Sequence, residues 1–130
     1  MTVRGKIDLK GLEPWLEDLA AAAKDIDAAA GRAIEAGQDV ALKGMRRRAP
    51  KDTHNLEEHL VITEVRIDGN FVYGEVGLIG ADADTARYGN AQEYGTSNMA
   101  AHPYIRPTMQ GDKGKIRKAM RVVLEEEGKL

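Results

Sequence analysis

The side chains best suited to proton transfer gather in one segment of the chain. Glu93 and Tyr94 are followed closely by His102, Tyr104 and Arg106, which together supply a carboxyl, two phenols, an imidazole and a guanidinium. A carboxyl held near an imidazole can act as a general acid and base. Gly95, Pro103 and Pro107 lie among them and exclude a long regular helix. The segment is therefore expected to follow a fixed irregular path, and ordered irregular segments often carry function.

No nucleophile accompanies these groups in a recognised arrangement. The chain has no cysteine, and its only serine, Ser97, does not lie in a Gly-x-Ser-x-Gly turn. Gly111 to Lys115 are rich in glycine and lysine but lack the spacing of a phosphate-binding loop. The sequence therefore predicts no catalytic residue and no enzyme.

The histidines and aspartates do not follow a metal-ligand pattern. His54 and His59 are five positions apart, so they diverge by about 140° on a helix, whereas the paired histidines of zinc hydrolases are four apart on one face. Asp82 and Asp84 lack the glycine and the distal glutamate of a calcium loop. The sequence predicts neither a metal nor a cofactor. A metal-dependent hydrolase would have to contain stoichiometric zinc.

A basic cluster precedes Pro50 and consists of Lys43, Arg46, Arg47 and Arg48. Such a cluster can contact phosphates. It can equally stabilise the negative end of a helix or match the charge of an acidic partner, and no aromatic residue is interleaved with it. We therefore predict contact with DNA or with an acidic partner as one interpretation and a solvated helix end as the other.

The composition is that of one small domain. The chain has 130 residues, a formal net charge of -2 and 5% aromatic residues. This balance gives no general attraction to nucleic acid or to anionic membranes. Absence of cysteine fits a reducing compartment, and no apolar run or signal-peptide core suggests a membrane segment. A core with so few aromatics is thin, and such a chain often completes its burial against another subunit.

The first third of the chain predicts a tail followed by a long helix. Residues 1–11 are expected to form a flexible tail or a short strand. Small and apolar residues then recur in steps of three and four over 12–48, which favours one helix packed along its length. A helix this long outruns so small a domain and would need a partner surface. A break near Gly31 or Gly37 into two packed helices is the alternative.

The remainder, 59–107 and 112–127, predicts a small sheet, loops and a closing helix. Residues 60–67 and 71–78 alternate and flank a turn signal at 68–70, which indicates an antiparallel β-hairpin. We expect a loop over 80–91, a strand end with a buried Tyr94, and a further short strand at 104–106. Apolar residues at helical spacing predict a helix over 112–127. The fold class is therefore α+β in a single domain, with three to four strands and a C-terminal helix packed on the sheet.

Three blocks of the chain resemble the small tail-component, or neck, proteins of long-tailed double-stranded DNA phages of the Hong Kong type. The first is Pro-x-Asp-Thr-Gly-x-Leu after a long helix, matched by Pro50 to Leu56. The second is Glu-Tyr-Gly-Thr after a hairpin, and the third is Pro-Phe-Leu/Ile-Arg-Pro before a closing helix. The chain departs at three positions: His54 replaces a glycine, Tyr104 a phenylalanine and Thr108 an alanine.

The resemblance implies a structural, non-enzymatic virion protein, assembled in the bacterial cytoplasm. Copies would form a ring that joins the DNA-filled head to the tail and contacts the head connector and the tail-tube or tail-terminator proteins, with DNA as passing cargo and no membrane. The segment from Glu93 to Pro107 would either contact a neighbouring subunit or lock the C-terminal helix on the sheet. Its candidate interface residues are Glu93, Tyr94, Gly95, Thr96, Pro103, Tyr104, Ile105, Arg106 and Pro107.

An alternative function stays open at this stage. In it, the chain is a small nucleic-acid-binding or regulatory module that reads phosphates with the basic helix end. That function predicts binding to duplex DNA with a steep loss of affinity as salt rises, whereas the structural function predicts little binding by the isolated subunit.

Overall fold

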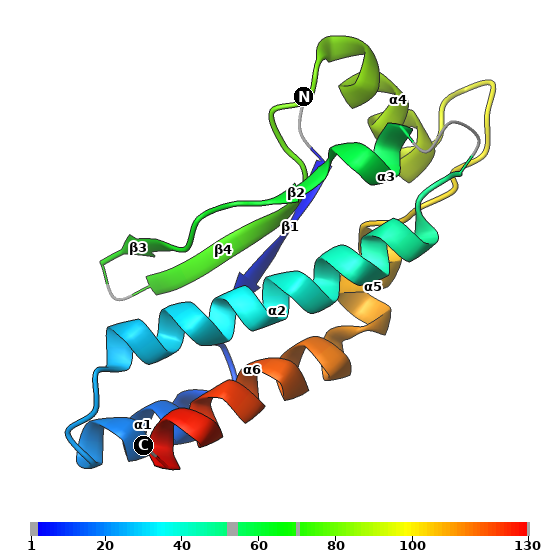
Figure 1. Ribbon diagram of the computed structural model, residues 1–130. Helices are drawn as coiled ribbons and strands as arrows, with labels where there is room; N and C mark the ends of the chain where they lie inside the picture. The colour runs from blue at the N-terminus through cyan, green and yellow to red at the C-terminus, as the bar shows by residue number, and fades with distance from the viewer. Residues whose placement is uncertain (1–2, 52–54, 70, 130) are drawn as a thin grey trace.

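A computed structural model describes residues 3–51, 55–69 and 71–129 and confirms the predicted α+β class (Figure 1). The strands and helices, in chain order, are β1 (Val3–Asp8), α1 (Glu13–Ala21), α2 (Ile26–Arg48), α3 (Asn55–His59), β2 (Leu60–Ile62), β3 (Arg66–Asp68), β4 (Phe71–Leu78), α4 (Ala83–Tyr94), α5 (Arg106–Gly111) and α6 (Lys113–Lys129).

The sheet has four antiparallel strands, with β4 at its centre. Strand β1 pairs along one side of β4, while β2 and β3 pair in succession along the other side. Of the two alternatives for 1–11, a tail or a short strand, the structure shows the strand. The predicted hairpin is confirmed, although its first strand, predicted over 60–67, is divided into β2 and β3. The two pairings place Ile62 opposite Val76 and Arg66 opposite Tyr73, so one extra residue lies on the β2–β3 side and forms a bulge. Of the predicted turn, Asn70 lies outside the described residues.

The predicted helix over 12–48 is wrong in its continuity. Helix α1 ends at Ala21 and α2 begins at Ile26, so the break precedes both of the glycines considered for it. Ala23 adopts a positive φ of 58°, and the side chain of Asp25 accepts the Ala28 N–H at 3.1 Å as the cap of a new helix. Helix α1 therefore folds back beside α6 (Figure 1). The chain therefore has two shorter helices in place of one overlong helix, and helix length gives no reason to expect a partner.

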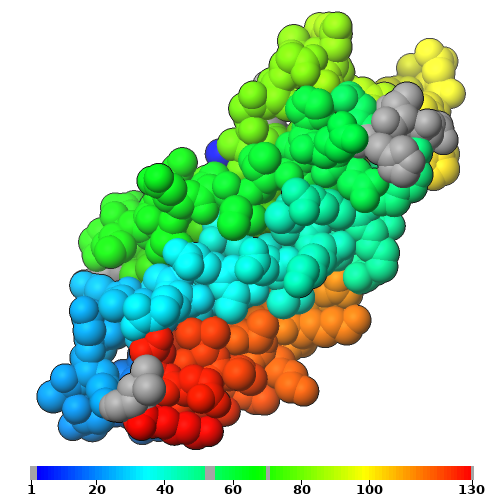
Figure 2. Space-filling view, in the orientation of Figure 1, coloured from blue at the N-terminus to red at the C-terminus, as the bar shows by residue number. Residues whose placement is uncertain are grey.

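Helix α2 lies between the sheet and α6, and it forms the centre of the molecule (Figures 1 and 2). Its inward stripe is made of small residues, including the fully buried Ala33 and Ala41. A Cβ on Gly37 would lie 2.9 Å from both Ile7 of β1 and Met120 of α6. This glycine therefore allows close approach of a strand and a helix to α2 and does not break the helix. The buried apolar residues form one core cluster that extends from β1 to α6.

The loop predicted over 80–91 and the strand predicted over 104–106 are both wrong. Residues 83–94 form α4, because Asp82 caps its start by accepting the Thr85 N–H at 3.1 Å and Gly95, at a φ of 78°, ends it. Arg106 begins α5 and Pro107 occupies its first turn, a position that tolerates proline. The predicted closing helix is confirmed as α6, but its predicted packing on the sheet is wrong: α6 packs mainly on α2 and α1, and α2 separates it from the sheet. No helix among the described residues combines the length and the apolar character needed to cross a membrane.

Candidate functional site: a buried carboxylate clasp

The candidate segment folds so that the end of α4 meets the start of α5. Glu93, in the last turn of α4, has no exposed surface. Its carboxylate accepts the backbone N–H groups of Tyr104 at 2.9 Å, Ile105 at 2.7 Å and Arg106 at 3.1 Å. These N–H groups lie at the start of a helix, where no backbone acceptor is available within the helix. Glu93 therefore caps α5 from another helix. We call Glu93, Tyr94, Tyr104, Ile105 and Arg106 the Glu93 clasp.

Arg106 closes the clasp from its outer side. Its Nε donates to the Glu93 carboxylate at 2.9 Å and its Nη2 donates to the Glu93 backbone carbonyl. The guanidinium also lies over the ring of Tyr94, with Cζ 4.8 Å from the ring centroid, a favourable cation–π contact. The Arg106 side chain is half exposed while the Glu93 side chain is fully buried. A solvent-facing cation thus balances the buried charge.

Tyr104 anchors the clasp in the core. It is fully buried, and its hydroxyl donates to the carbonyl of Gly89 in α4 at 3.1 Å. A Cβ on Gly89 would lie 2.8 Å from that hydroxyl, so the glycine leaves the space that the phenol fills. The Thr108 hydroxyl donates to the Tyr104 carbonyl at 2.8 Å. Tyr104 and Thr108, two of the three positions that depart from the resembled blocks, therefore each add a hydrogen bond.

The electrostatics of the clasp hold Glu93 ionised. Burial by itself raises the pKa of the Glu93 carboxyl, but the N–H groups of Ile105, Tyr104 and Arg106 and the Arg106 side chain outweigh it and lower the pKa below its usual value. Burial, with the nearby Glu93 charge, raises the pKa of the Tyr104 phenol. A carboxylate that is both occupied and stabilised as the anion is a poor general base. The arrangement suits a structural joint.

The nine predicted interface residues lie in the Glu93 clasp or next to it in sequence, but they differ in exposure. Among them Tyr94, Thr96 and Arg106 are exposed. The expected burial of Tyr94 is wrong: 58% of it is exposed. The rest are buried or half-buried: Glu93, Gly95, Pro103, Tyr104, Ile105 and Pro107.

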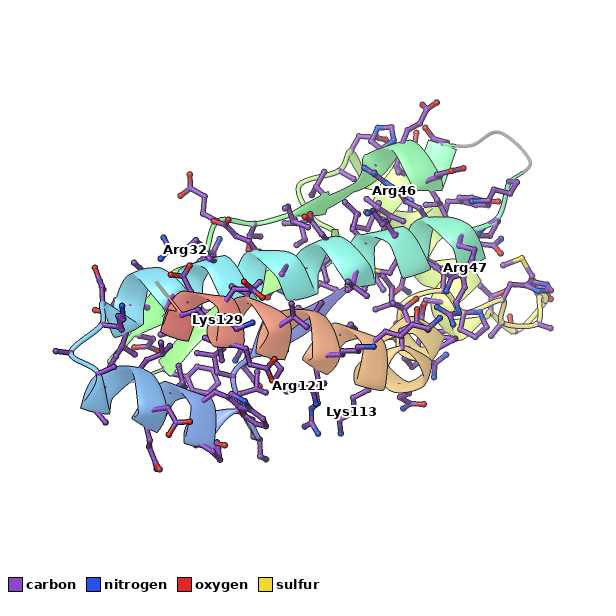
Figure 3. All side chains as sticks on the ribbon, turned by 60° about the horizontal axis from the view of Figure 1, so that its bottom comes forward. Arg32, Arg46, Arg47, Lys113, Arg121 and Lys129 are labelled. Atoms are coloured by element: carbon purple, nitrogen blue, oxygen red, sulfur yellow. The ribbon has the colours of Figure 1, made fainter. Side chains whose placement is uncertain are left out.

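The basic cluster does not form one free patch. Arg48 makes a two-pronged pair with the buried Asp112, with N–O distances of 2.7 and 3.1 Å, and Arg47 reaches the same carboxylate at 3.2 Å. Hydrogen bonding to Arg48 lowers the pKa of Asp112 and raises that of Arg48. Arg46 points instead toward the Leu60 carbonyl, so Arg46 and Arg47 diverge (Figure 3). Lys43 is exposed on α2.

The residues considered as metal ligands have other roles. Asp82 caps α4, and the hydrogen bond from Thr85 lowers its pKa. Asp84 pairs with Arg87 on the surface, and the His59 ring nitrogen lies 2.7 Å from the Asn55 carbonyl oxygen. His54 lies outside the described residues, as do Asp52 and Thr53 of the first family block. The described part of the chain contains no group of three potential ligands that could hold a metal.

Sequence reasoning missed two polar residues that organise the core. Asp112 joins α2 to the start of α6, as described above. Gln38 is fully buried on α2, and its amide nitrogen donates to the carbonyls of Thr63 and Glu75, each at 3.0 Å, where the sheet bulges. The signal available in the sequence was a glutamine in the otherwise small and apolar stripe of α2.

None of the family models, curated proteins or solved structures that were compared matches this chain.

Proposed function

We propose that this chain is a structural, non-enzymatic protein of the head–tail connector of a bacteriophage or prophage. In this proposal, copies form a ring that joins the DNA-filled head to the tail. The observation that carries it is the contact between two of the resembled sequence blocks: Glu93 of the second block bonds to Arg106 of the third. Blocks that bond to each other are expected to persist together because they hold the fold.

The occupied state of the acid–base groups supports a structural role. The carboxylate of Glu93 takes three backbone N–H groups and one guanidinium, and the Tyr104 hydroxyl is committed to Gly89. A general base or acid needs a free position facing a substrate. The segment that first suggests catalysis is used to join α4 to α5.

The exposed apolar residues of the sheet support a role in assembly. Strands β2 and β3 lie at a sheet edge, and Ile67 and Phe71 at the end of the hairpin are 61% and 44% exposed. Val61 and Ile62 of β2 are also about two-fifths exposed. Apolar side chains along a free edge are typical of a surface that contacts another protein. The proposed partners are further copies, the head connector and the tail-tube or tail-terminator proteins, in the neck of the virion.

The alternative function, phosphate recognition by the basic helix end, gains no support from the geometry. Arg47 and Arg48 are engaged with Asp112, and Arg46 turns toward β2. Release of these side chains to phosphates would leave the buried Asp112 carboxylate without its cations, which is costly. In the proposed function, DNA is therefore only the cargo that passes through the ring.

The experiment that tests this function is deletion of the gene from an inducible lysogen that carries it. After induction, electron microscopy should show DNA-filled heads and separate tails, and the chain supplied from a plasmid should restore joined particles. Normal numbers of infectious, joined particles without the gene would contradict the proposal. Loss of heads or of DNA packaging, with tails unaffected, would also place the function elsewhere.

A further inference from the structure

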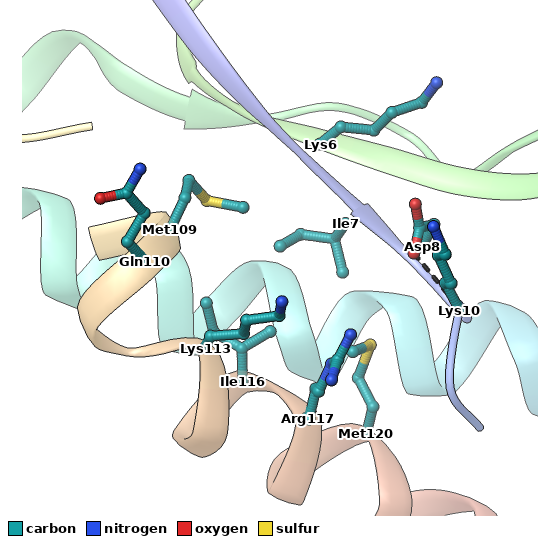
Figure 4. Close-up of a pocket in the computed structure, with 10 residues that line it drawn as sticks. All are labelled: Lys6, Ile7, Asp8, Lys10, Met109, Gln110, Lys113, Ile116, Arg117 and Met120. Carbon is teal, nitrogen blue, oxygen red and sulfur yellow. Dashed lines mark hydrogen bonds between the residues drawn. The ribbon is translucent and has the colours of Figure 1, made fainter. Parts of the chain in front are cut away.

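A groove of about 410 Å³ opens between β1 and the α5–α6 corner (Figure 4). Its floor is apolar and consists of Ile7, Met109, Ile116 and Met120. Methionine side chains adapt to the shape of a partner. Lys10, Lys113 and Arg117 surround this floor, whereas Lys6 extends away from it over the rings of Phe71 and Tyr73.

The cations of this groove differ from three arginines elsewhere on α2 and α6. Arg32, Arg48 and Arg121 are each paired with a carboxylate. In the described part of the chain, by contrast, no ion pair involves Lys10, Lys113 or Arg117.

Two carboxylates near the groove are already engaged with backbone groups. Asp8 accepts the backbone N–H of Lys10 at 3.1 Å, and Glu13, whose charge acts on Lys10 and Arg117, accepts the N–H of Gly11 at 3.1 Å. Both carboxylates remain charged, but four cations, Lys6, Lys10, Lys113 and Arg117, line the groove, so it retains an excess of positive charge above an apolar floor.

The β3–β4 hairpin has the complementary chemistry. Ile67 is the most exposed large apolar residue of the described chain, at 61%. Arg66, directly before it, is paired with Glu75 at 3.5 Å. Glu64 and Asp68 lie to either side of Arg66 and Ile67, are exposed, and make no ion pair with any described residue. Strand β3 lies toward the end of the elongated molecule that also carries α1, away from α5 (Figure 1). An acidic, apolar hairpin and a basic, apolar groove therefore occur on the same chain.

We infer that the groove of one copy receives the β3–β4 hairpin of a second copy, with Ile67 over the methionines and Glu64 and Asp68 beside Lys113 and Arg117. Because the contact joins two different surfaces, each copy offers one groove and one hairpin, and repetition of the contact gives a ring if it closes. The inference rests on the proposed function and identifies the surfaces that build its ring. Exposed ion pairs contribute little each, so the isolated chain associates weakly and less at high salt.

Cysteine cross-linking tests this contact directly, because the chain has no cysteine of its own. A chain carrying Ile67→Cys is mixed with a chain carrying Gln110→Cys, at the rim of the groove, under mild oxidation. The control partner carries Val122→Cys, which is also exposed but lies nine residues from Lys113 and thus about 180° around α6. The heterodimer should form at least about tenfold faster with Gln110→Cys, since association raises the effective concentration of the two thiols.

Exchange of the charges across the proposed contact provides a second test, with the same cross-linking measurement. The pair Glu64→Lys and Asp68→Lys on the Ile67→Cys chain should reduce the cross-linking rate, and Lys113→Glu with Arg117→Glu on the partner should restore it. Equal rates with Gln110→Cys and Val122→Cys, no cross-linking with either, or no rescue by the exchanged charges would overturn the inference. Protection of Gln110→Cys from a thiol reagent by duplex DNA would assign the groove to nucleic acid and would also overturn it. Each of these results leaves the lysogen experiment to decide the function separately.

Discussion

At the scale of single residues, the decisive feature is the buried carboxylate of Glu93. It satisfies three N–H groups that open α5 and carries the counter-charge of Arg106. Burying a charge is unfavourable unless it is paired and hydrogen-bonded. Here both conditions are met, so the residue joins two helices at a point where neither could supply the bonds alone.

Glu93→Gln should lower the free energy of unfolding by about 3 kcal/mol at pH 7, because an amide leaves Arg106 without its counter-charge and can turn only one oxygen toward three N–H donors. Glu17→Gln is the matched control, since Glu17 is exposed on α1. Urea unfolding followed by circular dichroism measures both. Equal stability of the two variants would show that the clasp does not hold the fold.

The same variant should alter the response to acid. The folded-state pKa values of Glu93 and Asp112 lie below their ordinary values of 4.5 and 3.8. The stability they contribute is therefore present above those ordinary values and is lost as the pH falls through the lower folded-state values. The free energy of unfolding of the native chain should decline below about pH 4.5, and the decline should be shallower in Glu93→Gln. An identical slope in both proteins would contradict the assignment.

At the scale of secondary-structure elements, the small residues of α2 allow neighbouring elements to pack closely against it. Gly44 is buried where Arg48, Thr108 and Asp112 meet, and a Cβ there would overlap the carboxylate of Asp112 and lie 2.9 Å from the Thr108 methyl. Gly31, on the same helix, has no neighbour within 4 Å of the position its Cβ would take. Substitution of Gly31 therefore tests helix propensity alone, whereas substitution of Gly44 also tests packing.

Gly31→Ala should stabilise the protein by up to about 1 kcal/mol, because alanine is the better helix former. Gly44→Ala should destabilise it by about 1–3 kcal/mol, because the added methyl displaces Asp112 from Arg48. Thermal unfolding of the two variants beside the native chain gives the comparison. A gain of stability in Gly44→Ala would mean that the Asp112 pair tolerates displacement and is not a fixed joint.

Elements with a regular hydrophobic period could be predicted from the sequence. Elements whose ends depend on capping residues were not. The hairpin and α6 follow from periodicity, whereas residues 1–11 predicted either a tail or the short strand that forms. The break at 22–25 could not be predicted from glycine, because it depends on Ala23 in a left-handed conformation and on the cap at Asp25. Helix α4 has weak hydrophobic periodicity and a loop-like composition. Its N-cap Asp82 and its C-cap Gly95 were the signals by which the sequence could have predicted it. The hydrogen-bond partners of Glu93 could not be predicted from the sequence, because they are backbone N–H groups at the start of a different helix, α5.

At the scale of the whole molecule, charge pairing and exposed apolar surface are distributed unevenly. Arg32, Arg47 and Arg48 of α2 are paired with carboxylates. By contrast, the groove cations Lys10, Lys113 and Arg117 make no ion pair with any described residue, and the β3–β4 hairpin has exposed apolar residues. A chain with net charge of only -2 can nevertheless associate through local complementarity. This distribution is what a repeating contact between copies requires.

The central claim, that the chain acts as a lasting component and not as a catalyst or regulator, is tested most directly by its copy number in purified particles. Quantitative mass spectrometry, calibrated on the major capsid protein, measures this number in virions from an induced lysogen. The account predicts the chain in every preparation at a constant, low ratio to the capsid protein that survives washing in high salt. Absence of the chain from joined particles, or a ratio that varies with the amount expressed, would contradict it.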